Sequence, residues 1–156
     1  MRIQIAVVGR LRDGPEAALS ADYVARAAAA GKQIGFKSVD LTEVEGKPPG
    51  DPRAEATALY RATPDDARKI LLDERGAEWT SRQLAEKLAR WRDDGTSCAT
   101  FWIGGADGVS QSIRDNADEK LAFGRQTWPH RLVRVMISEQ IYRAVTILCG
   151  TPYHRD

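Results

Sequence analysis

The order of strand-like and helix-like segments along this chain predicts an α/β fold: a single-domain α/β/α arrangement with a parallel sheet covered on both faces. Apolar runs typical of buried strands end on glycine, most clearly within the segment 101–108. Helix patterns with capping and terminating residues fill the stretches between these runs. The 156 residues are expected to form one domain, 1–156, with a substantial buried core.

The amino-terminal part of the chain predicts strand, helix and strand. Residues 1–8 first alternate and then run apolar into Gly9, as in a strand that becomes buried in a sheet. Residues 16–30 are rich in alanine with apolar residues at helical spacing, and we expect Gly31 to end this helix. Residues 34–44 alternate again and predict the second strand.

A stretch rich in proline and glycine at 45–52 cannot hold regular structure and predicts an exposed loop. Pro52 favours the start of a helix over residues 53–62. A short strand is predicted at 69–72.

Capping signals are clearest in the next segment. Thr80 and Gln83 have the spacing of a capping box, and Gly95 should end the helix that begins there. A strand follows at 97–103, and Ser110 can cap a brief helix that runs to residue 117. A last short strand is expected at 121–123.

The longest helical pattern covers residues 129–148. One apolar stripe at a spacing of three or four residues should face the sheet: Val133, Ile137, Ile141, Ala144 and Leu148. A second apolar group points elsewhere: Leu132, Val135, Met136 and Tyr142. This is more apolar surface than one neighbour can bury, so we expect a homodimer contact, with burial on two sides of one subunit as the alternative.

The glycines of the segment 101–108 are the main candidate for a binding feature. Gly104, Gly105 and Gly108 let a backbone or a ligand come close where side chains would block it. Since ligands bind beyond the carboxyl ends of parallel strands, the loops at Leu72, Gly104 and Gly124 should share one edge of the sheet. A tight turn that binds nothing is the alternative interpretation.

Composition limits the classes of function. The 23 Lys and Arg residues nearly balance the 22 Asp and Glu residues, so the net charge of +1 gives no global attraction to nucleic acid or membrane. No membrane span or signal peptide is expected, and the default location is the cytoplasm. Cys98 and Cys149 are expected to be reduced thiols without a disulfide, and no metal site is expected.

Two groups near the carboxyl end carry chemistry. Glu139 and Arg143 have the spacing of an ion pair within a helix. The tail Tyr153, His154 and Arg155 offers an aromatic ring, a group that titrates near neutral pH and an anion-binding guanidinium.

Three stretches together resemble one known family. They are Phe-Trp-Ile-Gly-Gly-Ala-Asp-Gly at 101–108, Leu-Val-Arg-Val-Met-Ile-Ser-Glu-Gln-Ile-Tyr-Arg-Ala at 132–144, and Pro-Tyr-His-Arg at 152–155. They are similar to the bacterial ribosomal large-subunit methyltransferase H (YbeA-like) family of the SPOUT superfamily, and the similarity covers nearly the whole chain. The region 43–66 departs from the lysine-rich character of many relatives, which puts an RNA-docking role of that loop in doubt.

The resemblance implies a fold, a reaction and partners. The implied fold has a deep trefoil knot near the carboxyl end, and the implied state is a homodimer. The implied reaction is S-adenosylmethionine-dependent methylation of N3 of a pseudouridine in 23S rRNA, without a metal. Free rRNA, the large subunit and the assembled ribosome stay open as substrates.

The resemblance also implies site residues. The implied cofactor contacts are Leu72, Gly105, Gly124, Arg125, Gln126, Thr127, Trp128 and Pro129. Tyr153, His154, Arg155 and Arg143 would face RNA and the reacting base. For the chemistry, we expect His154 or Glu139 to help remove a proton and Arg155 or Arg143 to stabilise the anionic base.

Two rival functions are less well supported. A binding module that holds a nucleotide or RNA without chemistry would use the glycines only for a turn. A dinucleotide-binding dehydrogenase lacks the Gly-x-Gly-x-x-Gly pattern after the first strand, and the P-loop pattern is missing too. An RNA enzyme of nearly neutral charge would use a local basic patch, and five arginines could converge to form one: Arg125, Arg131, Arg134, Arg143 and Arg155.

Overall fold

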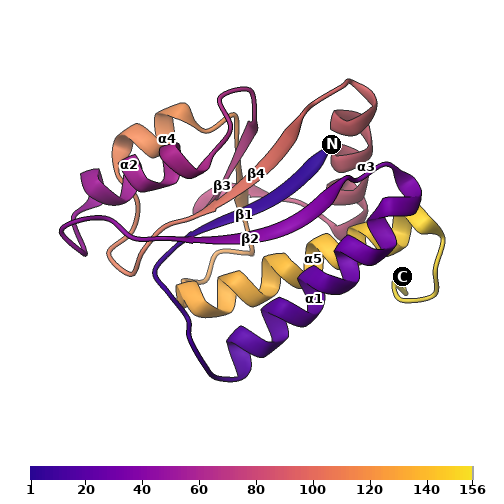
Figure 1. Cartoon of the computed structure of the whole chain (residues 1–156), viewed down its shortest axis with the longest axis horizontal. Coiled ribbons are helices and arrows are strands. Elements are labelled where there is room, and N and C mark those ends of the chain that lie inside the picture. The colour runs from indigo at the N-terminus through magenta and orange to yellow at the C-terminus, as the bar shows by residue number, and fades with distance from the viewer. Residues whose placement is uncertain (156) are drawn as a thin grey trace.

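A computed structural model describes residues 1–155 as one parallel five-stranded sheet with helices on both faces (Figure 1). The strands are β1 (Arg2–Val8), β2 (Ser38–Val44), β3 (Arg68–Glu78), β4 (Cys98–Ile103) and β5 (Glu119–Ala122). Their order in the sheet is β2-β1-β4-β3-β5, and every neighbouring pair is parallel. The α/β fold with a parallel sheet is therefore confirmed, and the trefoil knot stays a prediction.

The helices divide into two layers. They are α1 (Pro15–Gly31), α2 (Pro52–Ala62), α3 (Ser81–Asp93), α4 (Gln111–Asn116) and α5 (His130–Cys149), with a short 3-10 helix η1 (Lys32–Ile34) after α1. Buried residues of α1, α3 and α5 form the larger hydrophobic core with one face of the sheet, and those of α2 and α4 form a smaller core with the other face. The expected cover on both faces is confirmed.

The helix starts follow their capping residues. In α3 the Thr80 N–H donates to Gln83 Oε1 at 2.8 Å, and the Gln83 N–H donates to Thr80 Oγ1 at 3.1 Å, which completes the capping box. Ser110 Oγ accepts from the Ile113 N–H at the start of α4. Asp51 caps α2 and Pro52 occupies its first turn. These caps satisfy backbone groups that a helix leaves unpaired.

Helix α1 ends at Gly31, as expected, and Gly31 packs tightly against Phe36, where an added Cβ would lie 3.1 Å from Phe36 Cβ. Two strand boundaries differ from the expectation. The 3-10 helix η1 and a turn at Gly35, whose φ is 87°, follow α1, so β2 begins only at Ser38 instead of residue 34. Strand β3 is also longer than predicted, because it resumes pairing with β5 beyond an irregularity between Leu72 and Ala77.

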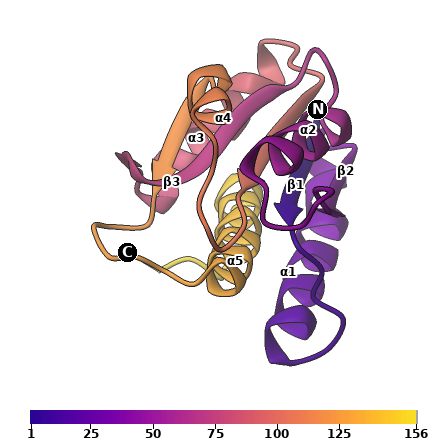
Figure 2. The same ribbon diagram turned by 90° about the vertical axis from the view of Figure 1, so that its left-hand side faces the viewer.

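Helix α5 lies between α1 and α3 beneath the sheet (Figure 2). The apolar stripe of α5 that was expected to face the sheet is only partly buried. Its residues Ile137, Ile141 and Ala144 are fully buried, while Val133 and Leu148 are half-buried. Tyr142 of the second apolar group packs against Tyr23 of α1, with ring centroids 6.0 Å apart, whereas Leu132 stays 41% exposed. Burial on two sides within one subunit thus accounts for part of the second group, and the homodimer stays a prediction. Within residues 1–155 no helix has both the length and the apolar character needed to cross a membrane.

Candidate active site

A cavity of about 600 Å³ opens where β3, β4 and β5 approach their carboxyl ends. Its walls come from residues 72–74 on β3, from the turn after β4, from residues 121–129 and from the first turn of α5. Apolar side chains form much of the floor: Leu72, Ile103, Leu121, Phe123 and Val133. Leu72, Gly104 and Gly124, which were expected to share one edge of the sheet, therefore all line this cavity.

The turn after β4 is shaped by the absence of side chains. An added Cβ on Gly104 would lie 2.3 Å from Val109 Cγ1, and one on Gly105 would lie 2.8 Å from a carboxylate oxygen of Glu55. Gly108 has a φ of 86°, and its N–H donates to the Gly105 carbonyl oxygen at 3.2 Å. Glycine is needed here for close approach and for the left-handed conformation, so the cavity meets backbone rather than side chains.

The loop between β5 and α5 forms the facing wall. Gly124 turns with a φ of 90°, and Trp128 Nε1 donates to the Phe123 carbonyl oxygen at 3.1 Å. Thr127 Oγ1 donates to Glu74 Oε2 at 3.0 Å and so ties this loop to β3. These bonds fix the position of the loop over the cavity.

The cavity gathers most of the residues expected to contact the cofactor. Those that line it are Leu72, Gly105, Gly124, Gln126, Thr127, Trp128 and Pro129. Arg125 is exposed and is not among the lining residues. Leu72 was expected at a strand end, but it lies inside β3, just before the irregularity that separates the two paired segments of that strand.

Asp73, Glu74, Arg114 and His130 also line the cavity, and they were missed at the sequence level. Asp73 and Glu74 directly follow the apolar run 70–72, so a polar pair after a buried strand was an available signal. Arg114 stands in the middle of a short helix, and nothing in the local sequence marks it.

Asp73 and Arg114 form the charged pair of the cavity wall. Arg114 Nε donates to Asp73 Oδ2 at 2.7 Å, and the Arg75 N–H donates to Asp73 Oδ1 at 2.9 Å. Burial of Asp73 favours its neutral form, but these hydrogen bonds and the nearby arginine charges outweigh burial and lower the pKa of this carboxyl. The wall therefore carries a fixed ion pair whose carboxylate is only 3% exposed.

His130 stands at the start of α5 and is half-buried. Burial, and then the positive charges of Arg131 and Arg134, lower the pKa of this imidazole, while the Glu55 carboxylate acts in the opposite direction. The ring that faces the cavity is therefore mainly neutral at neutral pH.

A second polar cluster lies along the other half of α5. The Glu139 carboxylate accepts from Arg143 Nε at 3.0 Å, from the Tyr153 hydroxyl at 3.0 Å and from Gln140 Nε2 at 2.8 Å. Arg143 Nη1 lies 3.4 Å from His154 Nδ1, and its guanidinium carbon lies 4.9 Å from the centre of the Tyr153 ring. The tail thus folds back onto α5 and brings four of the five expected catalytic residues together.

Arg155, the fifth, is exposed and does not take part in these contacts. Burial, followed by hydrogen bonds with Tyr23 and Glu139, raises the pKa of the Tyr153 hydroxyl well above its usual value. The hydrogen bond to Glu139 raises the pKa of Arg143. Tyr153 therefore acts as a neutral donor and Arg143 as a permanent cation.

The cavity and the tail cluster lie at different positions along α5. The helix begins beside the ends of the strands and runs to the opposite side of the molecule, where the carboxyl end lies (Figure 1). From Val133 in the cavity wall, the helical rise places Glu139 about 9 Å and Arg143 about 15 Å further along the axis. One subunit therefore does not bring the two groups of residues into a single site.

The expected basic patch does not form as a unit. Arg134 is buried, with 4% of its surface exposed, and Arg143 is paired with Glu139. Arg125, Arg131 and Arg155 are exposed, but they stand on separate segments.

Comparison with known proteins identifies the family. Residues 1–154 match the model of a family described as predicted SPOUT methyltransferase. Proteins named ribosomal RNA large subunit methyltransferase H are similar over essentially their whole length. The protein from Paracoccus denitrificans is 54% identical over 156 residues, that from Phenylobacterium zucineum is 52% identical over 156 residues, and each alignment covers 100% of both chains. The protein from Hyphomonas neptunium is 51% identical over 155 residues, which cover 99% of both chains. The chain therefore belongs to the SPOUT methyltransferase family.

Proposed function

We propose that this protein transfers a methyl group from S-adenosylmethionine to N3 of a pseudouridine in 23S rRNA. Membership in a methyltransferase family and relatives named for the large ribosomal subunit support this assignment. The observation that carries it is the glycine-walled cavity at the strand ends, where most of the residues expected to hold the cofactor meet.

The cavity has the properties that such a cofactor requires. Its volume of about 600 Å³ is in the range of small-molecule sites. The glycine turn at 104–108 leaves backbone groups available to a purine or a ribose, and an added Cβ at Gly104 or Gly105 would collide with neighbouring side chains. The carboxylate of Glu74 suits a ligand that carries a sulfonium and an ammonium charge, whereas the carboxylate of Asp73 is already paired with Arg114.

We assign cofactor contacts to Leu72, Gly105, Gly124, Gln126, Thr127, Trp128 and Pro129. Arg125 is left outside this group because it does not line the cavity. When bound there, the cofactor supplies an electrophilic methyl group, so the chain has to orient the base and remove its N3 proton.

The tail cluster supplies one side chain to accept the N3 proton and others to stabilise the negative charge that is left on the base. Three residues donate hydrogen bonds to the Glu139 carboxylate, so we assign Glu139 to holding Arg143 and Tyr153 in place and assign the proton of N3 to His154. Arg143, held by Glu139, then stabilises the negative charge on the base, and the exposed Arg155 adds to it.

Two subunits are needed to combine these parts. Since the tail cluster of one chain lies beyond reach of its own cavity, the tail of a second copy would complete the site. The exposed apolar side chains Trp128 and Leu132 beside the cavity provide surface for such a contact. A homodimer that modifies ribosomal RNA in the cytoplasm is the resulting assignment, with the large subunit or the assembled ribosome as the substrate.

The direct test is a methyl-transfer assay with labelled S-adenosylmethionine and ribosomes that lack the modification. Calorimetry with the cofactor alone separates binding from catalysis. Label in N3-methylpseudouridine of 23S rRNA is expected. Cofactor binding without any transfer would instead support the binding-module alternative.

A mixing experiment tests the shared site. Gly105→Val subunits lack a working cavity and His154→Ala subunits lack a working tail, so each homodimer should be inactive. Heterodimers formed by co-expression should regain activity, because one of their two sites pairs an intact cavity with an intact tail. No recovery in verified heterodimers would place the complete site within one chain.

A further inference from the structure

The loop that follows β1 is held in place by a buried arginine from the start of α5. Arg134 Nη2 donates to the Gly9 carbonyl oxygen at 2.9 Å, and Nη1 donates to the Glu43 carboxylate at the end of β2. The Leu11 N–H donates to the same Glu43 oxygen at 2.9 Å. Arg134 is 4% exposed, so this guanidinium fixes the backbone of the loop rather than meeting a ligand itself.

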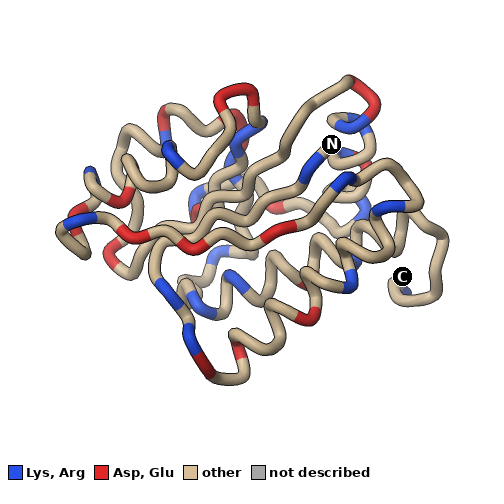
Figure 3. The backbone as a smooth tube through the Cα atoms, viewed as in Figure 1, with Lys and Arg blue, Asp and Glu red and all other residues tan. Residues whose placement is uncertain are grey.

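This anchor brings the loop after β1 beside the first turns of α5, and both segments carry exposed arginines. Arg10 and Arg12 stand in the anchored loop, and Arg131 lies three residues before Arg134, on the neighbouring turn of the same helix face. Lys and Arg positions gather where the chain after β1 passes the first turns of α5 (Figure 3). We call Arg10, Arg12 and Arg131 the arginine surface.

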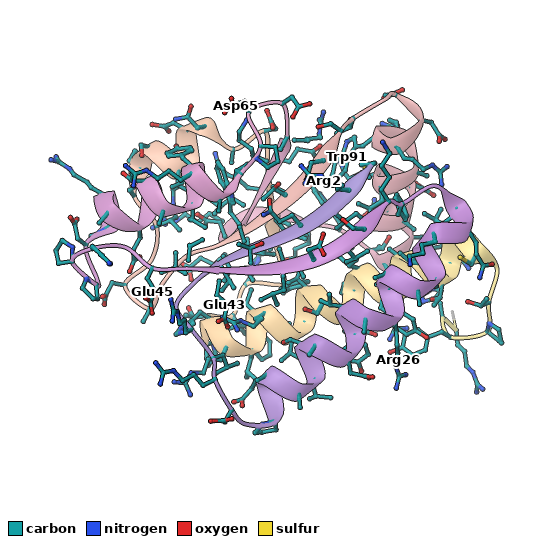
Figure 4. All side chains as sticks on the ribbon, viewed as in Figure 1. Arg2, Arg26, Glu43, Glu45, Asp65 and Trp91 are labelled. Carbon is teal, nitrogen blue, oxygen red and sulfur yellow. The ribbon has the colours of Figure 1, made fainter. Side chains whose placement is uncertain are left out.

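The positive charges of the arginine surface are largely free of strong ion pairs with acidic residues of the chain. Glu43 is engaged by Arg134, and Figure 4 shows it near the start of α5, with Glu45 beyond the end of β2. Arg10 pairs with Glu45 at 3.3 Å, but both side chains are about half exposed, 58% and 47%, and such a pair is weak. Within residues 1–155 neither Arg12 nor Arg131 forms an ion pair, and the loop 9–14 contains one acidic residue, Asp13.

The arginine surface is adjacent to the cavity. His130 and Val133 line the cavity from the same turns of α5 that carry Arg131 and Arg134. A nucleotide whose base reaches the cavity would therefore leave its flanking phosphates close to these arginines. Guanidinium groups bind phosphate oxygens with two parallel hydrogen bonds.

We propose that Arg10, Arg12 and Arg131 bind phosphates of the RNA segment that flanks the target nucleotide, and that Arg134 positions the loop for this contact. The inference rests on the proposed function. It gives a chain with a net charge of +1 a local means to hold a polyanion.

The test compares Arg10→Ala/Arg12→Ala and Arg131→Ala with Arg2→Ala. Arg2 is exposed at the opposite end of β1, so its replacement removes one positive charge, as Arg131→Ala does, but far from the cavity. Methyl transfer is measured against the concentration of unmodified ribosomes at several salt concentrations. Binding of a labelled RNA fragment that contains the target nucleotide is measured by fluorescence anisotropy.

The arginine-surface variants should raise KM and the RNA Kd at least tenfold at low salt while kcat and cofactor binding stay unchanged. The slope of log affinity against log salt should become shallower by about one for each arginine removed. Arg2→Ala should match the parent in every measurement.

Parental KM, RNA affinity and salt slope in both surface variants would overturn the inference. Loss of dimerisation with unchanged RNA affinity would also overturn it, because the surface would then serve a subunit contact. The experiments distinguish failure of the proposed function from failure of the inference about the arginine surface. A parent that binds RNA but transfers no methyl group contradicts the proposed function, whereas the anisotropy data still decide the role of the arginines.

Discussion

The cavity at the start of α5 and the tail cluster further along the same helix differ in what they are made of. The cavity is shaped by glycine backbone, apolar floor residues and a loop tied by single hydrogen bonds. The tail cluster consists of side chains that saturate one carboxylate, Glu139. The first region should therefore be sensitive to added atoms, and the second to removed functional groups.

Gly105→Val should give the largest effect. The added Cβ would lie 2.8 Å from Glu55 Oε2, so either this carboxylate or the Gly105 backbone that lines the cavity has to move. We expect cofactor affinity to fall by about a hundredfold or more while the protein stays folded. Calorimetry with S-adenosylmethionine and a thermal unfolding curve measure both properties. Tight binding in this variant would contradict the role of the glycine turn.

His154→Ala tests the other region. The methyl-transfer rate should fall by about a hundredfold or more, because a positioned proton acceptor typically contributes that much. Cofactor affinity should not change, since the tail of each subunit lies far from its own cavity. Single-turnover transfer to unmodified ribosomes separates this effect from binding. A parental rate would remove His154 from the proposed chemistry.

Asp73→Asn should lower the free energy of unfolding by about 1–3 kcal/mol, because Arg114 loses a buried carboxylate partner while remaining partly solvated. The folded-state pKa of Asp73 is lowered, so its contribution is complete above the unfolded pKa of about 3.9 and is lost as the pH falls through the folded value. Urea unfolding between neutral pH and pH 3 measures this. Toward pH 3 the free energy of unfolding of the parent should fall by the contribution of Asp73. The variant has no carboxylate at this position, so its free energy of unfolding should not show this fall.

Tyr153→Phe should have the smallest effect. The ring keeps its contact with Tyr142, whose centroid is 4.7 Å away, and only the hydroxyl that donates to Glu139 is removed. Glu139 retains its bonds from Arg143 and Gln140, so we expect a destabilisation of about 0.5–1.5 kcal/mol and a rate decrease of a few fold. Tyr153→Ala is the matched control, because it also removes the ring from Arg143. Equal effects of the two variants would mean that the hydroxyl, not the stacking, matters.

Local signals predicted the helices well. The capping box of Thr80 and Gln83 and the cap at Ser110 are visible in sequence because their partners lie three residues away. The end of α1 at Gly31 was predicted correctly, but the start of β2 was predicted too early, because the 3-10 helix η1 and the turn at Gly35 come before it. The length of β3 depends on its pairing with β5, which no local pattern reports.

The sequence by itself determined the alternation of strands and helices, the parallel sheet and the meeting of Leu72, Gly104 and Gly124 at one edge, since each follows from local periodicity and the direction of the strands. Only the tertiary structure decided that Arg134 is buried against Gly9 and Glu43 rather than displayed with the other arginines. It also placed the tail cluster away from the cavity, because the length of α5 separates them. These outcomes depend on partners about ninety or more residues apart and on the rise of a long helix, and both arise only when the chain is folded.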